Sequence, residues 1–281
     1  MERCTDNMRV VKSQLSHCLD LFDVMSDAGR EHRLTDLATH LGNPKSSVQR
    51  LLDHLREEGW VEQNTATGHY RLTLRLALLG HRYMQSAGIA DATQGILNRV
   101  AQTTNELVRL TVVDQTRLVW IGAAQGAAAG LLYQPSMGGS ILAFATANGK
   151  AWLATLADEE ACAIALGEGL GRTPASGGPK AVRSIDALRA ELATARARGY
   201  AVADEEAEAG VAAIAVAIRD PQTGIALGTT SVAGPMVRLP SARHPAIAAT
   251  LASAALELAR VWPLPRPSAA HSASLASKVG T

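Results

Sequence analysis

The residues LGNPKSSVQRLLDHLREEG, positions 41–59, decide the fold of the N-terminal part of the chain. Gly42 ends one helical pattern, Asn43 is placed to cap the next helix, and Pro44 suits its first position. The new helix is predicted to run to residue 58 and to end at Gly59. On a helical wheel, four aliphatic residues cluster on its inner face: Val48, Leu51, Leu52 and Leu55.

The outer face of this predicted helix carries hydroxyl, amide and cationic groups, which hydrogen-bond phosphates and base edges. No acidic residue occurs between Asp36 and Asp53, so nothing there repels a phosphate backbone. The helix N-terminus also favours an anion through its free N–H groups and its dipole. A solvated surface helix is the alternative. The candidate DNA-contacting residues are Pro44, Lys45, Ser46, Ser47, Gln49 and Arg50.

The flanking segments complete a known motif. Apolar residues at helical spacing lie upstream, between Val11 and Phe22, and a second short helix is predicted after Thr35, its expected N-cap. Downstream, strands at 60–62 and 69–72 flank a glycine-bearing turn at 64–68. Helix, turn, helix and hairpin predict a winged helix-turn-helix over residues 11–73. Its wing adds His69 and Arg71 to the candidate DNA contacts.

Residues 74–90 are predicted to form a linker helix that is apolar on more than one face. Such a helix favours packing on a partner, although packing on its own chain is the alternative. One winged helix reads only a few base pairs. We therefore expect a homodimer or homotetramer on a palindromic operator in double-stranded DNA.

Composition limits which other functions the chain can have. The 281 residues carry a formal net charge of +1, so the DNA argument rests on local placement rather than on bulk charge. The three cysteines form no disulfide framework, which favours the cytoplasm: Cys4, Cys18 and Cys162. We expect no signal peptide, no membrane span, no metal site and no cofactor.

Residues 91–262 mix strands and helices without βαβ regularity, which favours an α+β domain with an antiparallel sheet and flanking helices. Strands are expected at 107–113, 118–121, 131–133, 213–218 and 225–231. Helices are expected around 96–100 and at 146–156, 185–198 and 244–260. Prolines after Trp262 predict a disordered tail over residues 263–281.

The chain resembles the IclR family of bacterial transcription regulators from about residue 11 to residue 262. The matching pieces, in order, are residues 41–52, 68–72, 79–80, 146–151, 198–200, 204–206, 210–211 and 231–235. The resemblance implies a winged helix-turn-helix, a GAF-like effector domain and a dimer or dimer of dimers. It also implies that a small metabolite, often a carboxylate or an aromatic, controls a catabolic or stress operon.

The resemblance also places an effector site. Members that bind small acids carry polar groups at positions that here are Ala203, Ala213 and Ala233. Alanine cannot hydrogen-bond a small polar ligand but can line a roomier apolar site. We therefore expect a larger or more apolar effector, such as an aromatic acid, although a domain that only dimerises is the alternative. The candidate effector residues are Ala147, Asn148, Ala203, Asp204, Ala213, Ser231 and Ala233.

An enzyme using Ser231 and Asp204 is the alternative from another class. No G-x-S-x-G elbow is present, and adjacent acids do not by themselves surround a substrate. The pair Gly149–Lys150 lacks the earlier glycine of a phosphate loop and is followed by Ala151. The sequence therefore favours a regulator over an enzyme. A ligand-binding or dimerisation module without DNA binding remains a further alternative.

Overall fold

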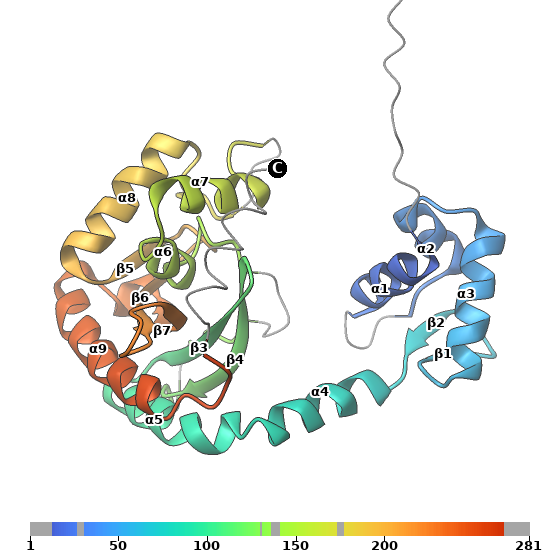
Figure 1. Cartoon of the computed structure of the whole chain (residues 1–281), viewed down its shortest axis with the longest axis horizontal. Coiled ribbons are helices and arrows are strands. Elements are labelled where there is room, and N and C mark those ends of the chain that lie inside the picture. The colour runs from blue at the N-terminus through green and yellow to red at the C-terminus, as the bar shows by residue number, and fades with distance from the viewer. Residues whose placement is uncertain (1–12, 27–30, 130, 136–140, 173–176, 267–281) are drawn as a thin grey trace, which may run out of the picture. The chain divides into compact units, whose positions relative to one another are not determined.

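A computed structural model describes residues 13–26, 31–129, 131–135, 141–172 and 177–266. The chain divides into two compact units, Met1–Ser86 and Ala87–Thr281, whose elements are labelled in Figure 1. Each unit has its own buried apolar core.

The first unit contains the predicted helix, turn, helix and hairpin. Its strands pair antiparallel, with Glu62 opposite Arg71. Leu21, Leu37, Leu52 and Tyr70 are almost fully buried in its core. The elements are α1 (Gln14–Met25), α2 (Leu34–Leu41), α3 (Lys45–Glu57), β1 (Val61–Gln63), β2 (Tyr70–Leu72) and α4 (Arg75–Ser86).

Two predicted helix caps are wrong. Pro44 itself takes the N-cap position of α3, because Asn43 belongs to the end of α2: its N–H donates to the Ala38 carbonyl. The Asn43 side chain lies 2.7 Å from Nδ1 of His17. Thr35 lies inside α2, whose N-cap is Arg33.

The second unit is built on a five-stranded antiparallel sheet in the order β4-β3-β7-β6-β5, as the α+β prediction required. Its strands are β3 (Leu107–Asp114), β4 (Arg117–Gln125), β5 (Ala201–Asp204), β6 (Val211–Arg219) and β7 (Ala226–Pro235). Its helices are α5 (Ile89–Thr104), α6 (Ala147–Leu153), α7 (Asp158–Gly167), α8 (Ile185–Arg198) and α9 (His244–Arg260), with 3₁₀ turns η1 (Met236–Arg238) and η2 (Ser241–Arg243).

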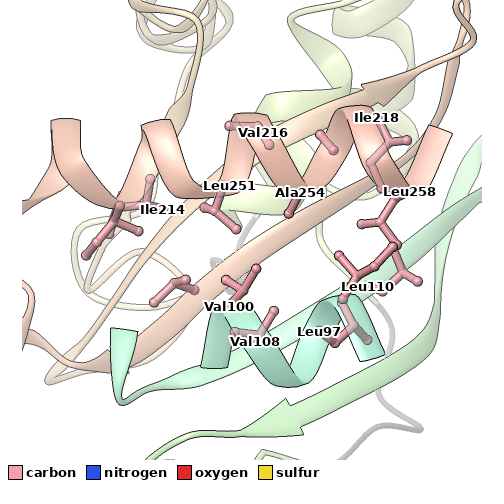
Figure 2. Packing of buried hydrophobic residues seen from close by; sticks show 14 of the residues in the cluster. Leu97, Val100, Val108, Leu110, Ile214, Val216, Ile218, Leu251, Ala254 and Leu258 are labelled. Atoms are coloured by element: carbon pink, nitrogen blue, oxygen red, sulfur yellow. The ribbon is translucent and has the colours of Figure 1, made fainter. Parts of the chain in front are cut away.

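Helices α5 and α9 cover one face of this sheet (Figure 2). Alternate strand residues point into that core because successive side chains of a strand face opposite ways. Val108, Leu110 and Ile214 meet Leu97 and Leu251 there, all buried. Helix α6 contacts β5, β6 and β7, and alanines of β5 and β6 cluster with alanines of α6 on the other face.

Two expectations for the second unit need correction. Residues 131–133 form no strand, because side chains take their carbonyls: Arg238 donates to the Leu131 oxygen at 2.8 Å and Gln125 to the Tyr133 oxygen at 3.2 Å. Residues 263–266, assigned to a disordered tail, lie against the domain. Arg266 pairs with the buried Asp220 at 2.9 Å. Residues 267–281 lie outside the described part of the chain.

Candidate nucleic-acid interface and ligand site

Helix α3 has a buried and an exposed face. Val48 and Leu52 are fully buried in the core of the first unit. The predicted contact residues Lys45, Ser46 and Arg50 are exposed on the other side, as are Pro44 and Ser47. The turn at Gly42, in the left-handed conformation (φ +63°), brings α2 to the start of α3. Cationic and hydroxyl groups therefore share one solvent-facing surface.

Gln49 is placed differently from the other candidates. It is half-buried, and its Nε2 donates to Oδ1 of Asp53 at 3.1 Å and to the hydroxyl of Tyr70 at 3.0 Å. Its amide thus ties α3 to the hairpin rather than facing solvent freely.

The wing candidates lie beside acids. Nδ1 of His69 is 3.6 Å from Oε2 of Glu31, and Nε of Arg71 is 2.6 Å from Glu62. Hydrogen bonds, chiefly from Asn64, lower the pKa of Glu31, which keeps it anionic. The exposed Arg33 at the start of α2 donates to Nε2 of His69 at 3.3 Å. Sequence reasoning missed this cation, whose place before a helix start was a usable signal.

In the second unit the strand register brings the alanine positions together. Ala203 pairs with Ala213, and Ala213 pairs with Ala233, across β5, β6 and β7. Ala147 of α6 is buried in the same cluster as Ala203. The buried Asn148 donates from Nδ2 to Oγ1 of Thr229 at 2.9 Å. The candidate face is therefore lined mostly by methyl groups.

Asp204 does not join this face. It follows Ala203 on β5 and pairs with Ala212, so its side chain points to the opposite face of the sheet. Its carboxylate is half-exposed and lies 3.2 Å from Nζ of Lys180. Ser231 pairs with Ala215, on the same face as Ala213. Ser231 and Asp204 thus point away from each other, which leaves the enzyme alternative without a paired acid.

Sequence reasoning also missed Arg109. It lies in β3 directly opposite Ser231 of β7 and is 9% exposed. Its guanidinium carbon sits 3.9 Å from the ring centroid of Trp120 and 5.9 Å from that of Tyr133. The signal in the sequence was one cation within the apolar run LVRLTVV of residues 107–113.

Lys150 of α6 forms a buried ion pair with Glu206. Its Nζ lies 2.7 Å from both carboxylate oxygens of Glu206 and 3.2 Å from Glu191, and its side chain is 1% exposed. Burial raises the pKa of Glu206, and Lys150 opposes that rise. The pair holds α6 against the segment that follows β5, so Lys150 has a structural partner and is not free for a phosphate.

A separate cleft of about 750 Å³ opens beside Trp152, Trp262 and the β3–β4 turn, and none of the predicted effector residues lines it. Among the described residues, no three His, Cys, Asp or Glu side chains are grouped as a metal site. The described helices are all too short or too polar to cross a bilayer.

Comparison with known proteins agrees with this architecture. The family model for the IclR helix-turn-helix domain matches residues 14–65. The model for the C-terminal domain of bacterial IclR transcriptional regulators matches residues 81–260. The regulator XynR of Escherichia coli K12 is 31% identical over 211 residues, covering 75% of this chain and 81% of XynR.

Solved structures show the same fold. An IclR-type regulator from Silicibacter sp. TM1040 has a TM-score of 0.76 at 26% identity, covering 91% of this chain and 98% of that one. An IclR homologue from Microbacterium hydrocarbonoxydans, solved with 4-hydroxybenzoate, has a TM-score of 0.71 at 22% identity, covering 89% and 98%. These relatives are regulators and not enzymes. The chain belongs to the IclR family of bacterial transcription regulators.

Proposed function

We propose that this protein controls a catabolic operon by binding a palindromic operator through α3, under the control of a small aromatic or apolar metabolite held by the second unit. The observation that carries the DNA part is the exposed face of α3, where Lys45, Ser46 and Arg50 stand together with no acid among them. A helix with such a face fits the major groove of B-DNA.

The wing and its neighbours support this interface. Arg33, His69 and Arg71 place basic side chains on the hairpin and next to it: His69 and Arg71 each lie close to an acid, and Arg33 donates to His69. We assign these residues to the phosphate backbone, which positions the protein, and α3 to the base edges. Gln49 serves by fixing the hairpin against α3.

The linker helix supports a homodimer or homotetramer. No residue of α4 is buried, and its large apolar side chains are exposed: Leu78 is 61% and Tyr83 65% exposed. Leu74, just before the helix, is 78% exposed. Exposed apolar side chains at this density mark an association surface. A second copy also supplies the second half-site that a palindrome requires.

The DNA assignment is tested by fluorescence anisotropy with the protein's own upstream DNA at stated salt concentrations. Arg50→Ala should weaken specific binding by about 1–3 kcal/mol, and Lys45→Ala should lower the slope of log K against log salt by about 1 per contact. Arg56→Ala is the matched control, because Arg56 lies on the same helix but bonds Gln63 and Asp53. Equal losses for Arg50→Ala and Arg56→Ala would refute the proposed reading face.

The effector proposal rests on the row Ala203, Ala213 and Ala233, which offers an apolar lining. The homologue solved with 4-hydroxybenzoate supports an aromatic ligand for this fold. In a thermal-shift assay, 4-hydroxybenzoate should stabilise the protein and glyoxylate should not. The reverse result would contradict an apolar effector, and a domain that only dimerises would respond to neither.

A further inference from the structure

Two adjacent buried donors in the second unit have unused hydrogen-bonding capacity. Ser231 is fully buried and Arg109 nearly so, and the strand register places them opposite each other on β7 and β3. Neither the Ser231 Oγ nor the Arg109 Nε has a hydrogen-bond partner among the described residues. A buried polar atom without a hydrogen-bond partner lowers stability, so two side by side indicate a missing partner.

The chemistry of these atoms specifies that partner. The Arg109 Nε–H can only donate, and the serine hydroxyl can donate as well. One group that accepts from both atoms satisfies them together, and a carboxylate does so through its two oxygens. Stacking on Trp120 at 3.9 Å fixes the guanidinium plane. Tyr133 takes a hydrogen bond from the guanidinium, and the Nε–H, which lies in the same plane, is left for such an acceptor.

The charge of Arg109 points the same way. Burial lowers the pKa of its guanidinium, with Tyr133 first and Glu208 after it acting against that fall. The group stays cationic at any physiological pH. Glu208 is exposed and forms no described ion pair with it. Lys150, the only buried lysine among the described residues, is occupied by Glu206. One cation can therefore balance one negative charge, not the two of a phosphate ester.

The surroundings specify the rest of the ligand. Ala215 pairs with Ser231, and Ala213 and Ala233 lie in the next row on the same face. We infer that Arg109 and Ser231 bind the carboxylate of a monocarboxylic effector whose apolar body lies over these alanines. This inference rests on the proposed effector function and names the chemical class and the specificity-determining residue.

The test uses the full-length protein and calorimetric titration with matched acids and amides. The probes are 4-hydroxybenzoate and 4-hydroxybenzamide, benzoate and benzamide, and acetate as an acid without an apolar body. The wild type should bind each aromatic acid at least tenfold more tightly than its amide. Arg109→Met should remove that preference, and Ser231→Ala should reduce it several-fold. Arg117→Met, at a 74% exposed arginine on the same hairpin, should leave it unchanged.

The outcomes test the carboxylate anchor separately from the proposed apolar effector. Equal affinity of the wild type for acid and amide overturns the carboxylate anchor while an apolar effector stands, and this comparison needs no variant. Unchanged acid preference in Arg109→Met, with operator affinity kept as proof of folding, also overturns it. Arg109-dependent binding of acetate alone supports the anchor and refutes the apolar effector. Absence of any acid binding overturns both.

Discussion

Replacing Glu206 by glutamine tests whether the buried pair with Lys150 holds α6 in place. In the wild type, both Glu206 oxygens lie 2.7 Å from Nζ of Lys150. The two side chains are 11% and 1% exposed. The substitution keeps the shape of Glu206 but removes its charge, so the lysine keeps only Glu191, which is 43% exposed and 3.2 Å away.

The expected size follows from two opposing effects. At 2.7 Å and an effective dielectric constant of about 20, the attraction is about 6 kcal/mol. Desolvation of the two ions costs a similar amount, so the intact pair contributes little net stability. Removing one partner leaves the desolvation cost uncompensated, and Glu206→Gln should therefore lower the free energy of unfolding by about 3–5 kcal/mol. For a unit of this size, that lowers Tm by roughly 10 °C.

Lys150→Met should behave differently with pH. Without the lysine, the already raised pKa of Glu206 rises further. A carboxyl whose folded-state pKa lies above its unfolded value loses stability as pH rises between the two values. The Lys150→Met penalty should therefore be larger at about pH 8 than at about pH 5.

Differential scanning calorimetry of the full chain measures these effects in the transition of the second unit. A double-mutant cycle with Lys150→Met/Glu206→Gln isolates the coupling. The double variant should lose less stability than the sum of the single variants, because no unpaired charge remains buried. Single-variant losses below about 1 kcal/mol, or additive losses, would refute a buried pair.

Three further predictions use the same calorimetry. Gly149→Ala should abolish the unfolding transition of the second unit or lower its Tm severely, because the new Cβ would lie 2.1 Å from Cα of Ala143. Gly80→Ala, with open space around the new Cβ, should not. Equal behaviour of the two variants would contradict the close contact at Gly149. Burial is the main cause that raises the pKa of Glu168 to about 7, so ionisation of this carboxyl lowers the free energy of unfolding as pH rises from about 4.5 to 7. Glu168→Gln should therefore become more stable relative to the wild type over that range. A stability difference that does not change with pH would refute this. Asn148→Ala removes a buried donor 2.9 Å from a β7 threonine hydroxyl and should cost about 1–3 kcal/mol, so a neutral result would contradict that bond.

Most helices were predictable because their signals are local, but α7 was not predicted, because its small apolar residues do not mark a single face. The 3.6-residue period marks α3. Apolar spacing also marks α8 and α9, which end just before Gly199 and just before the Trp262 region, respectively. The errors at Asn43 and Thr35 are errors of one or two positions. They arise because neither helix uses a side-chain cap: the N-cap residues Pro44 and Arg33 make no side-chain cap hydrogen bond. The Asn43 side chain contacts His17 instead, a tertiary partner that no local pattern reveals.

The proposed effector site was harder to predict from the sequence, because it depends on which strands pair and in what register. Alternation places Arg109 on the face opposite Val108 and Leu110, but no local pattern places Ser231 beside it. A slip of one residue between β3 and β7 would turn one of the two to the other face. Gly228 restricts that slip, since a Cβ there would lie 2.0 Å from the Thr111 oxygen. A glycine with no side chain thus fixes the register on which the proposed carboxylate anchor depends.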